Sequence, residues 1–275
     1  MRFARFGLVL SFLLLNISVW GQQTQQTTTP TPEPQDPQAV SVLNQALAVA
    51  GGTAAIRAVQ DYTATGTISY PSQQDGQGPV TIQGMNGTEF RMDANLPAGT
   101  RSWAVAEGVI TTKNEQRTMW SMAPKGPVPS SDAFPFQTPW FPASVAFPVR
   151  QLAALVGNPS YSLSYKGITQ VDGHSVHDIQ FQRGSSAAVS SSGVTLPPRT
   201  RDIYIDTATF QIVAVSDTLP KNIPHELHYT AYQMTSGVLM PFSISENVEG
   251  QQSWVLQLNQ ISFNKGLQEA SFAIQ

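Results

Sequence analysis

The sequence predicts a mainly β protein: a large, curved antiparallel sheet of about ten strands, with two helices packed on its concave side. Most of the chain from Tyr62 to Leu258 alternates apolar and polar residues with a period of two, as strands with one buried face do. Short turn signals separate these runs, so consecutive strands are expected to be antiparallel neighbours. Only two segments have apolar residues at helical spacing. A sheet this wide must curl, split or close, and two helices can partly fill a curled one.

The strands are recognised by their alternating apolar residues. Such runs begin near Tyr62, Val80, Phe90, Trp103, Met119, Tyr161, Ile179, Ile203, Ile212, Tyr229, Phe242 and Trp254. The strongest hairpin signal is Asp172-Gly173, and the other good ones are Asp206 to Thr209, Ser236-Gly237 and Glu249-Gly250.

The first helical segment runs from about Pro37 to Gln60. Gly51-Gly52 breaks it, and Thr53 is expected to cap a short second part. The second segment runs from Pro142 to Val156, where Pro148 either kinks the helix or marks its start. Its apolar stripe consists of Val145, Val149, Leu152 and Leu155.

The N-terminal segment predicts export. Arg2 and Arg5 precede an apolar run that is shorter than the roughly 20 residues a spanning helix needs. Small residues before Gln22 suggest a signal peptide over 1–21, and the mature chain is expected not to be integral to the membrane. Residues 22–38 are rich in Gln, Thr and Pro and read as a disordered leader. Residues 39–275 then form a single β domain, in the periplasm or outside the cell.

Composition excludes several classes of protein. The chain has no cysteine, so neither a disulfide nor a lipid-modified N-terminal cysteine is available. Without Arg2 and Arg5, 13 basic and 18 acidic residues remain, a net charge of −5. The basic residues are scattered and never form a cluster of three, which argues against nucleic acid as a partner.

The histidines form two pairs with i, i+3 spacing, His174 with His177 and His225 with His228. On a strand, odd spacing sends two side chains to opposite faces, so neither pair can hold one metal ion. Zinc needs at least three converging ligands, which leaves only a site assembled across strands. The sequence therefore predicts no metal and no cofactor.

No catalytic residue is predicted. The segment from Gly173 to His177 comes nearest to a serine nucleophile elbow, but it lacks the final glycine and opens a strand rather than a helix. Four acidic residues lie at turns or alternate out of strands, where solvated or turn-forming carboxylates are typical; they are Asp172, Asp178, Asp202 and Asp206.

Large apolar side chains suggest a ligand site. Methionine and aromatic residues together suit ligands of loose shape, such as acyl chains. The loop 123–142 adds aromatic residues among prolines and is either a lid or a cover over the core, whereas 184–198 is rich in Ser and Gly and reads as a mobile hairpin loop. The candidate ligand-binding residues are Phe90, Met92, Trp103, Met119, Trp140, Phe141, Leu152 and Leu155.

Three groups of segments, taken in order, carry a family resemblance. Residues 47–52, 56–59 and 62–66 resemble the opening of exported LolA-like proteins, the outer-membrane lipoprotein-sorting family, in which a helix ending at a glycine pair leads into the first strand. Residues 203–209 are similar to a strand and turn of these proteins, and residues 236–241 and 261–264, with Phe272, to their C-terminal pattern. The resemblance covers most of 39–275, while the loops 123–142 and 184–198 depart from it. It implies an open antiparallel half-barrel, closed over by helices around an apolar cavity that in the sorting carriers receives lipoprotein acyl chains. No functional residue is carried over from the family.

The sequence thus leads to a non-catalytic exported protein that binds an apolar ligand, either lipid or lipoprotein acyl chains. The alternative is a structural or interaction module of the cell envelope, with a filled core and a protein partner. An uncharacterised hydrolase is the third possibility. Co-purifying lipid and uptake of a fluorescent fatty acid separate the first two hypotheses.

Overall fold

A computed structural model describes residues 34–71, 76–97, 99–106, 109–114, 117–122, 146–183, 200–219 and 222–274. For residues 105–106, 109–114, 117–122 and 183 it describes the backbone alone. All of these residues belong to the compact unit Pro32–Gln275.

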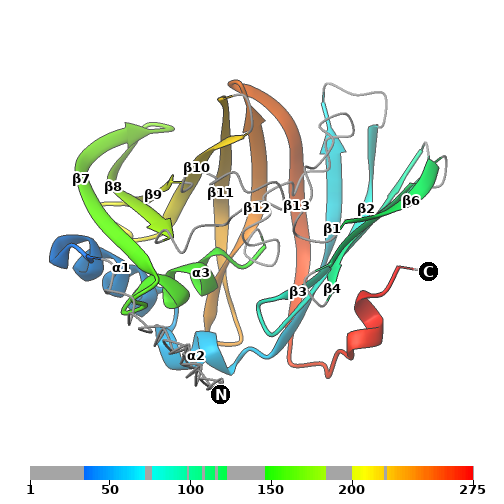
Figure 1. The fold of residues 1–275 in the computed structure, drawn as a ribbon, viewed down its shortest axis with the longest axis horizontal. Helices are drawn as coiled ribbons and strands as arrows, with labels where there is room; N and C mark the ends of the chain where they lie inside the picture. The colour runs from blue at the N-terminus through cyan, green and yellow to red at the C-terminus, as the bar shows by residue number, and fades with distance from the viewer. Residues whose placement is uncertain are drawn as a thin grey trace, which may run out of the picture. The chain divides into compact units, whose positions relative to one another are not determined.

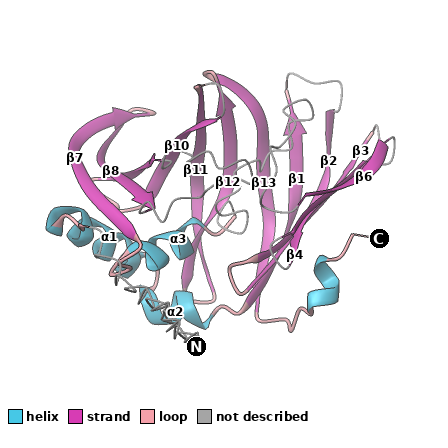
Figure 2. Ribbon diagram, in the orientation of Figure 1, coloured by secondary structure: helices cyan, strands magenta, loops and turns pink. Residues whose placement is uncertain are grey.

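One open sheet of thirteen strands forms the core of the fold (Figures 1 and 2). Its order is β6-β5-β4-β3-β2-β1-β13-β12-β11-β10-β9-β8-β7, and neighbouring strands are antiparallel throughout. The strands are β1 (Asp61–Tyr70), β2 (Gly76–Met85), β3 (Glu89–Leu96), β4 (Gly99–Ala106), β5 (Val109–Asn114), β6 (Arg117–Met122), β7 (Tyr161–Val171), β8 (His174–Arg183), β9 (Thr200–Asp206), β10 (Ile212–Leu219), β11 (Ile223–Thr235), β12 (Val238–Val248) and β13 (Gln251–Phe263).

The mainly β prediction is confirmed, but the sheet has thirteen strands rather than about ten. The residues around Val109 and Met119 form two short strands, β5 and β6, joined as a hairpin. Their Thr, Lys and Ser residues weaken the apolar alternation by which strands are recognised. The four predicted hairpin turns all join consecutive strands: Asp172-Gly173, Asp206 to Thr209, Ser236-Gly237 and Glu249-Gly250.

The two ends of the domain meet in the middle of the sheet. The first strand, β1, pairs with the last strand, β13, from Tyr62 opposite Phe263 to Ser69 opposite Val255. Two meanders therefore run outward from this seam, β1 to β6 on one side and β13 back to β7 on the other. The sheet stays open, with β6 and β7 as its edges (Figure 1).

The first predicted helical segment forms two helices, α1 (Pro37–Val49) and α2 (Gly52–Ala58). Thr53 does not cap α2 but lies inside it, and the cap position belongs to Gly51, which has a φ of 109°. A Cβ at Gly51 would lie 2.0 Å from the carbonyl oxygen of Gly237, and the Leu239 amide donates to the Ala50 carbonyl. Only glycine allows this close approach, which holds the α1–α2 corner against the β11–β12 hairpin.

The second predicted helix is shorter than expected. Helix α3 (Pro148–Leu155) begins at Pro148, which stands at the first helical position, where its missing N–H costs nothing. Among the described residues, no single helix is long and apolar enough to cross a membrane. Only α1 and α2 together reach that length and composition, as a pair bent by 64°.

The end of the predicted disordered leader belongs to the fold. Asp36 caps α1 by accepting a bond from the Gln38 amide, and Pro34–Asp36 run alongside β7 through two backbone hydrogen bonds to Leu163. The Gln35 amide group donates to the carbonyls of Leu155, Asn158 and Tyr161. The ordered chain therefore starts before residue 39, because these polar side chains satisfy backbone groups at the end of α3.

The C-terminal segment packs on the other face of the sheet. After β13 the chain turns at Asn264 and ends in the 3₁₀ helix η2 (Glu269–Phe272), which lies beside β3 and β4. Arg91 alternates with the inward-facing residues of β3 and donates to the carbonyls of Ser271 and Ala273. Phe272 is fully buried there.

Candidate ligand-binding site

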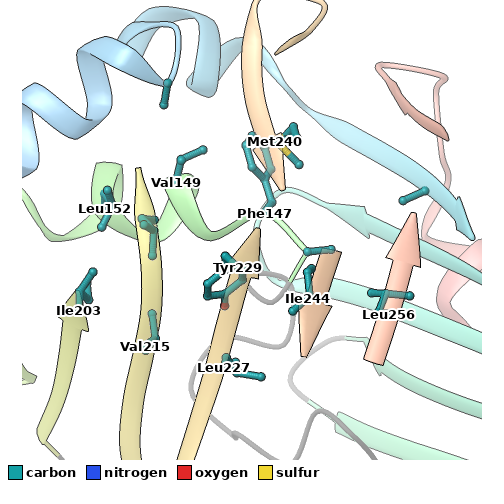
Figure 3. Packing of buried hydrophobic residues seen from close by; sticks show 14 of the residues in the cluster. Phe147, Val149, Leu152, Ile203, Val215, Leu227, Tyr229, Met240, Ile244 and Leu256 are labelled. Carbon is teal, nitrogen blue, oxygen red and sulfur yellow. The ribbon is translucent and has the colours of Figure 1, made fainter. Parts of the chain in front are cut away.

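A continuous apolar layer covers the inner face of the sheet, the face on which α1, α2 and α3 pack. Residues from β1–β4, β7–β13 and all three helices belong to one buried cluster. Figure 3 shows part of this layer, with Val149 and Leu152 of α3 over Ile203 and Tyr229 of the sheet. Strand alternation explains the layer, since every second residue of a strand points to the same face.

Three of the predicted ligand residues come together on β3 and β4. Met92 and Trp103 are direct cross-strand partners, and the rings of Phe90 and Trp103 meet edge to face with centroids 5.1 Å apart. All three side chains are at most 3% exposed. They form the aromatic part of the inner face on the β1–β6 side of the seam.

Leu152 and Leu155 lie on α3 and are equally buried. Both belong to the same cluster as Phe90, and Leu152 packs over the β7–β13 side of the seam, near Ile203 (Figure 3). Phe147, just before α3, connects the two parts, because its ring contacts Tyr62 of β1 edge to face and stacks on Phe263 of β13.

The remaining predicted residues cannot be placed as side chains. Met119 lies on β6, of which only the backbone is described. Trp140 and Phe141 lie outside the described residues, as do all of the loops 123–142 and 184–198. The assignment of these residues to the site stays a prediction.

Four charged side chains interrupt the apolar inner face. Arg201 Nη2 lies 2.9 Å from Asp217 Oδ2, and Asp217 Oδ1 lies 2.7 Å from His225 Nδ1. The other ring nitrogen of His225 lies 2.9 Å from Glu246 Oε1. The four side chains are only 4–7% exposed. The charged quartet consists of Arg201, Asp217, His225 and Glu246, one each from β9, β10, β11 and β12.

The charged quartet lies at the end of these strands that is remote from the α1–α2 corner. That corner contacts the start of β12 at Leu239, whereas Glu246 is near the end of β12 and His225 near the start of β11. Asp217 and His225 face each other two residue pairs from the β10–β11 connection. The inner face is thus apolar under the helices and charged near the opposite ends of these strands.

His225 stays protonated at neutral pH in the folded protein. Burial alone lowers the pKa of His225, but the hydrogen bonds and negative charges of Asp217 and Glu246 outweigh burial and raise the pKa to about 9. Both ring nitrogens therefore donate at neutral pH, one to each carboxylate. With His225 protonated, the two positive and two negative charges of the quartet sum to zero.

We expect the domain to lose stability as pH rises from about 6.5 to about 9. The folded-state pKa of His225 lies above its ordinary value of 6.5, so its contribution is complete below pH 6.5 and lost as pH approaches 9. A shift of this size corresponds to roughly 3 kcal/mol. Urea unfolding at pH 6, 7.5 and 9 measures the loss. H225Q should be less stable than the wild type at pH 6, and its free energy of unfolding should change little between pH 6 and 9. A wild type whose free energy of unfolding changes equally little would contradict the prediction.

His228 and His174 form their hydrogen bonds on the outer face and at a strand end. His228 lies on the face of β11 opposite to His225, as alternation predicts, and bonds to Asp172 and Glu226. His174 bonds to Asp206, which also accepts bonds from the amides of residues 208 and 209 and thereby shapes its turn. No three His, Asp or Glu side chains in the described part of the chain converge as a metal site.

The segment from Gly173 to His177 has no elbow geometry. Gly173 completes the β7–β8 turn and β8 begins at His174, so Ser175 is an early strand residue. A nucleophile elbow needs a strand-to-helix turn. The prediction that this segment is not a nucleophile elbow therefore agrees with the structure.

Comparison with known proteins identifies the fold. No family model and no curated protein matches the sequence. Among solved structures, a domain assigned to outer membrane lipoprotein sorting from Vibrio parahaemolyticus is similar with a TM-score of 0.53 at 12% identity, over 86% of this chain and 96% of that one. A LolA superfamily protein from Nitrosomonas europaea is similar with a TM-score of 0.54 at 9% identity, over 86% of this chain and 97% of that one. A DUF1329 family protein from Desulfovibrio piger is similar with a TM-score of 0.50 at 12% identity, over 88% of this chain and 98% of that one. The chain therefore has a LolA-like fold, as its sequence pattern indicated.

Proposed function

We propose that the protein is an exported, non-catalytic carrier that holds the acyl chains of a lipid or lipoprotein against the inner face of its sheet. The observation that carries this proposal is the continuous apolar layer, which joins Phe90, Met92 and Trp103 to Leu152 and Leu155 in one cluster. The lipoprotein-sorting assignment of the Vibrio structure supports the choice of ligand, and the predicted signal peptide supports export.

The described helices are small relative to the sheet. Helices α1, α2 and α3 contain 13, 7 and 8 residues. At 1.5 Å per residue and a width of about 10 Å they cover roughly 400 Å². Thirteen strands spaced about 4.8 Å apart, each about 30 Å long, present a face of roughly 2,000 Å². The three helices thus correspond to about a fifth of the inner-face area, and the β3–β4 part, which is buried all the same, lies away from them (Figure 2).

Binding by burial needs no catalytic group. Apolar surface gains about 25 cal/mol per Å² when it leaves water, so burying about 300 Å² of an acyl chain yields several kcal/mol. Because Phe90 and Met92 are fully buried, uptake requires the domain to open. Slow association relative to diffusion is therefore expected.

The test compares lipid uptake by the wild type and by two phenylalanine variants. Organic extracts of the exported protein are analysed by mass spectrometry, and a dansyl-labelled acyl chain is titrated into delipidated protein. A94F adds a ring to the inner face of β3, and N95F adds the same ring to the next, outward-facing residue. We expect A94F to weaken binding about tenfold or more and N95F to leave it unchanged.

A ligand effect on unfolding tests the proposal without any variant. If the folded state binds the acyl chain, the melting temperature of the wild type rises with lipid concentration. A wild type that purifies without lipid, takes up no probe and melts at a constant temperature would refute the proposal. Such a result would favour the envelope interaction module instead.

A further inference from the structure

The charged quartet stands where an apolar carrier has no structural need for it. Its neighbours on the inner face are apolar: Leu227 is the direct cross-strand partner of Val215 on one side and of Glu246 on the other. Taking charged groups out of water is costly, and replacing a buried charge network by well-packed apolar residues is often neutral or stabilising. The stability of the domain therefore does not explain why four adjacent strands each supply one charged residue here.

The quartet is arranged as a row of alternating charges. Along the strand order β9, β10, β11, β12 the side chains read positive, negative, positive, negative, since His225 carries a proton between two carboxylates. A group that inserts beside this row finds both hydrogen-bond donors and acceptors. Within the quartet itself, a group with a net charge finds no unbalanced charge of opposite sign.

A phenol hydroxyl adds to this polar end. Tyr229 follows His225 and Leu227 on the same face of β11 and is completely buried. Figure 3 shows its hydroxyl oxygen on the side of Leu227, away from Phe147 and α3. Burial raises the pKa of Tyr229, while the charges of Arg201 and Asp217 act in opposite directions, so the hydroxyl remains neutral.

We infer that the charged quartet is the polar end of the ligand site and that it selects a head group with no net charge, such as hydroxyl, ester or amide oxygens at the end of an acyl chain. This inference rests on the proposed function. An uncharged head group can exchange hydrogen bonds with the row at little electrostatic cost. An anionic head group would place a net negative charge beside Asp217 and Glu246, and the quartet itself has no spare positive charge to balance it.

The experiment uses two probes with the same acyl chain and amide linker, one with an uncharged end and one with an anionic end. Both carry a dansylaminoundecanoyl chain; one ends in an ethanolamide hydroxyl and the other in a taurine sulfonate. At about pH 6 the sulfonate is ionised and His225 is protonated even at the ordinary histidine pKa of about 6.5. We expect the wild type to bind the ethanolamide about tenfold or more tightly than the sulfonate.

Two variants of opposite sign test whether the quartet causes this preference. E246Q keeps an acceptor oxygen for His225 but leaves the quartet with a charge of +1, so the preference should shrink about tenfold or reverse. R201Q leaves the quartet with a charge of −1, so the preference for the ethanolamide over the sulfonate should increase. E226Q is the matched control, because Glu226 lies beside His225 on the outward face of β11 with 45% of its side chain exposed; its preference should equal that of the wild type.

The possible failures are distinguishable. If the wild type binds both probes equally, or if E246Q and R201Q leave the ratio unchanged, the quartet plays no part in head-group selection and the carrier proposal stands. If the wild type binds neither probe, the proposed function fails and this inference fails with it. If E246Q does not fold, the ratio of affinities for the two probes in R201Q and in the wild type still tests whether the quartet selects the head group.

Discussion

Replacing Asp217 by alanine is expected to lower the free energy of unfolding by about 3–5 kcal/mol, as removal of one partner from a buried ion network does. Asp217 is the residue of the quartet that holds two cations, Arg201 through one oxygen and His225 through the other. Without it, both cations stay buried while only Glu246 remains to balance them. Urea unfolding followed by tryptophan fluorescence measures the loss.

The control for D217A is the histidine–carboxylate pair on the outer face. Asp172 lies 2.6 Å from His228, but its side chain is 55% exposed. Loss of this exposed ion pair should therefore cost less than about 1 kcal/mol, and strain of alanine at the positive φ of 52° should add roughly 1 kcal/mol, so D172A stays well below D217A. Exchange of all four quartet residues for apolar ones of similar size should instead be neutral or stabilising by about 1–4 kcal/mol. A D217A protein as stable as D172A would show that the charges are not coupled in the folded state.

Replacing Asp61 by alanine is the second change with a large expected effect, a loss of about 3 kcal/mol or more. The Asp61 carboxylate is 4% exposed and accepts hydrogen bonds from the amides of Lys265, Gly266 and Leu267. Its own carbonyl accepts a bond from the Asn264 amide. The side chain thus holds the turn that follows β13 against the first residue of β1. Alanine would leave three amides without their acceptor at the seam that joins the two halves of the sheet.

Unfolding experiments and hydrogen exchange measure the effect of D61A. The amides of residues 265–267 should exchange much faster than in the wild type, while those of β11 and β12 keep their protection relative to global unfolding. D61N keeps one acceptor oxygen but turns an NH₂ group toward a donor, so an intermediate loss is expected. Equal stability of D61A and wild type would mean that the turn forms without this carboxylate.

Strand alternation in the sequence predicted the sheet and its turns because it is a local property. The pair Gly51-Gly52 and Pro148 likewise marked real helix boundaries through local backbone constraints. The contacts of Asp61 could not be predicted in this way, since its partners lie more than 200 residues away in the sequence. Similarly, the last residues of the expected leader are ordered only because β7 and α3 offer them hydrogen bonds.

The charged quartet was missed for a different reason. Charged strand residues are normally assigned to the solvated face, yet each member continues the inward alternation of its strand, as His225 does before Leu227 and Tyr229. Glu246 follows Ile244 in the same way. The available signal was a charged residue two positions from a run of inward-facing apolar residues. This pattern recurs on several strands of one meander. Which of these charges pair with one another depends on register, which alternation alone does not set.

The short stretch Pro34–Asp36 has a consequence for how the protein behaves at high concentration. β7 is an edge strand, and among the described residues only this stretch pairs with its outer side, at Leu163. Further along the same strand Ile168 is 62% exposed. An unpaired edge with apolar side chains is a template on which another chain can add a strand. Removal of the residues before Ala39 would take away this pairing, so we expect the shortened chain to add a strand from another molecule at β7 more readily than the intact chain.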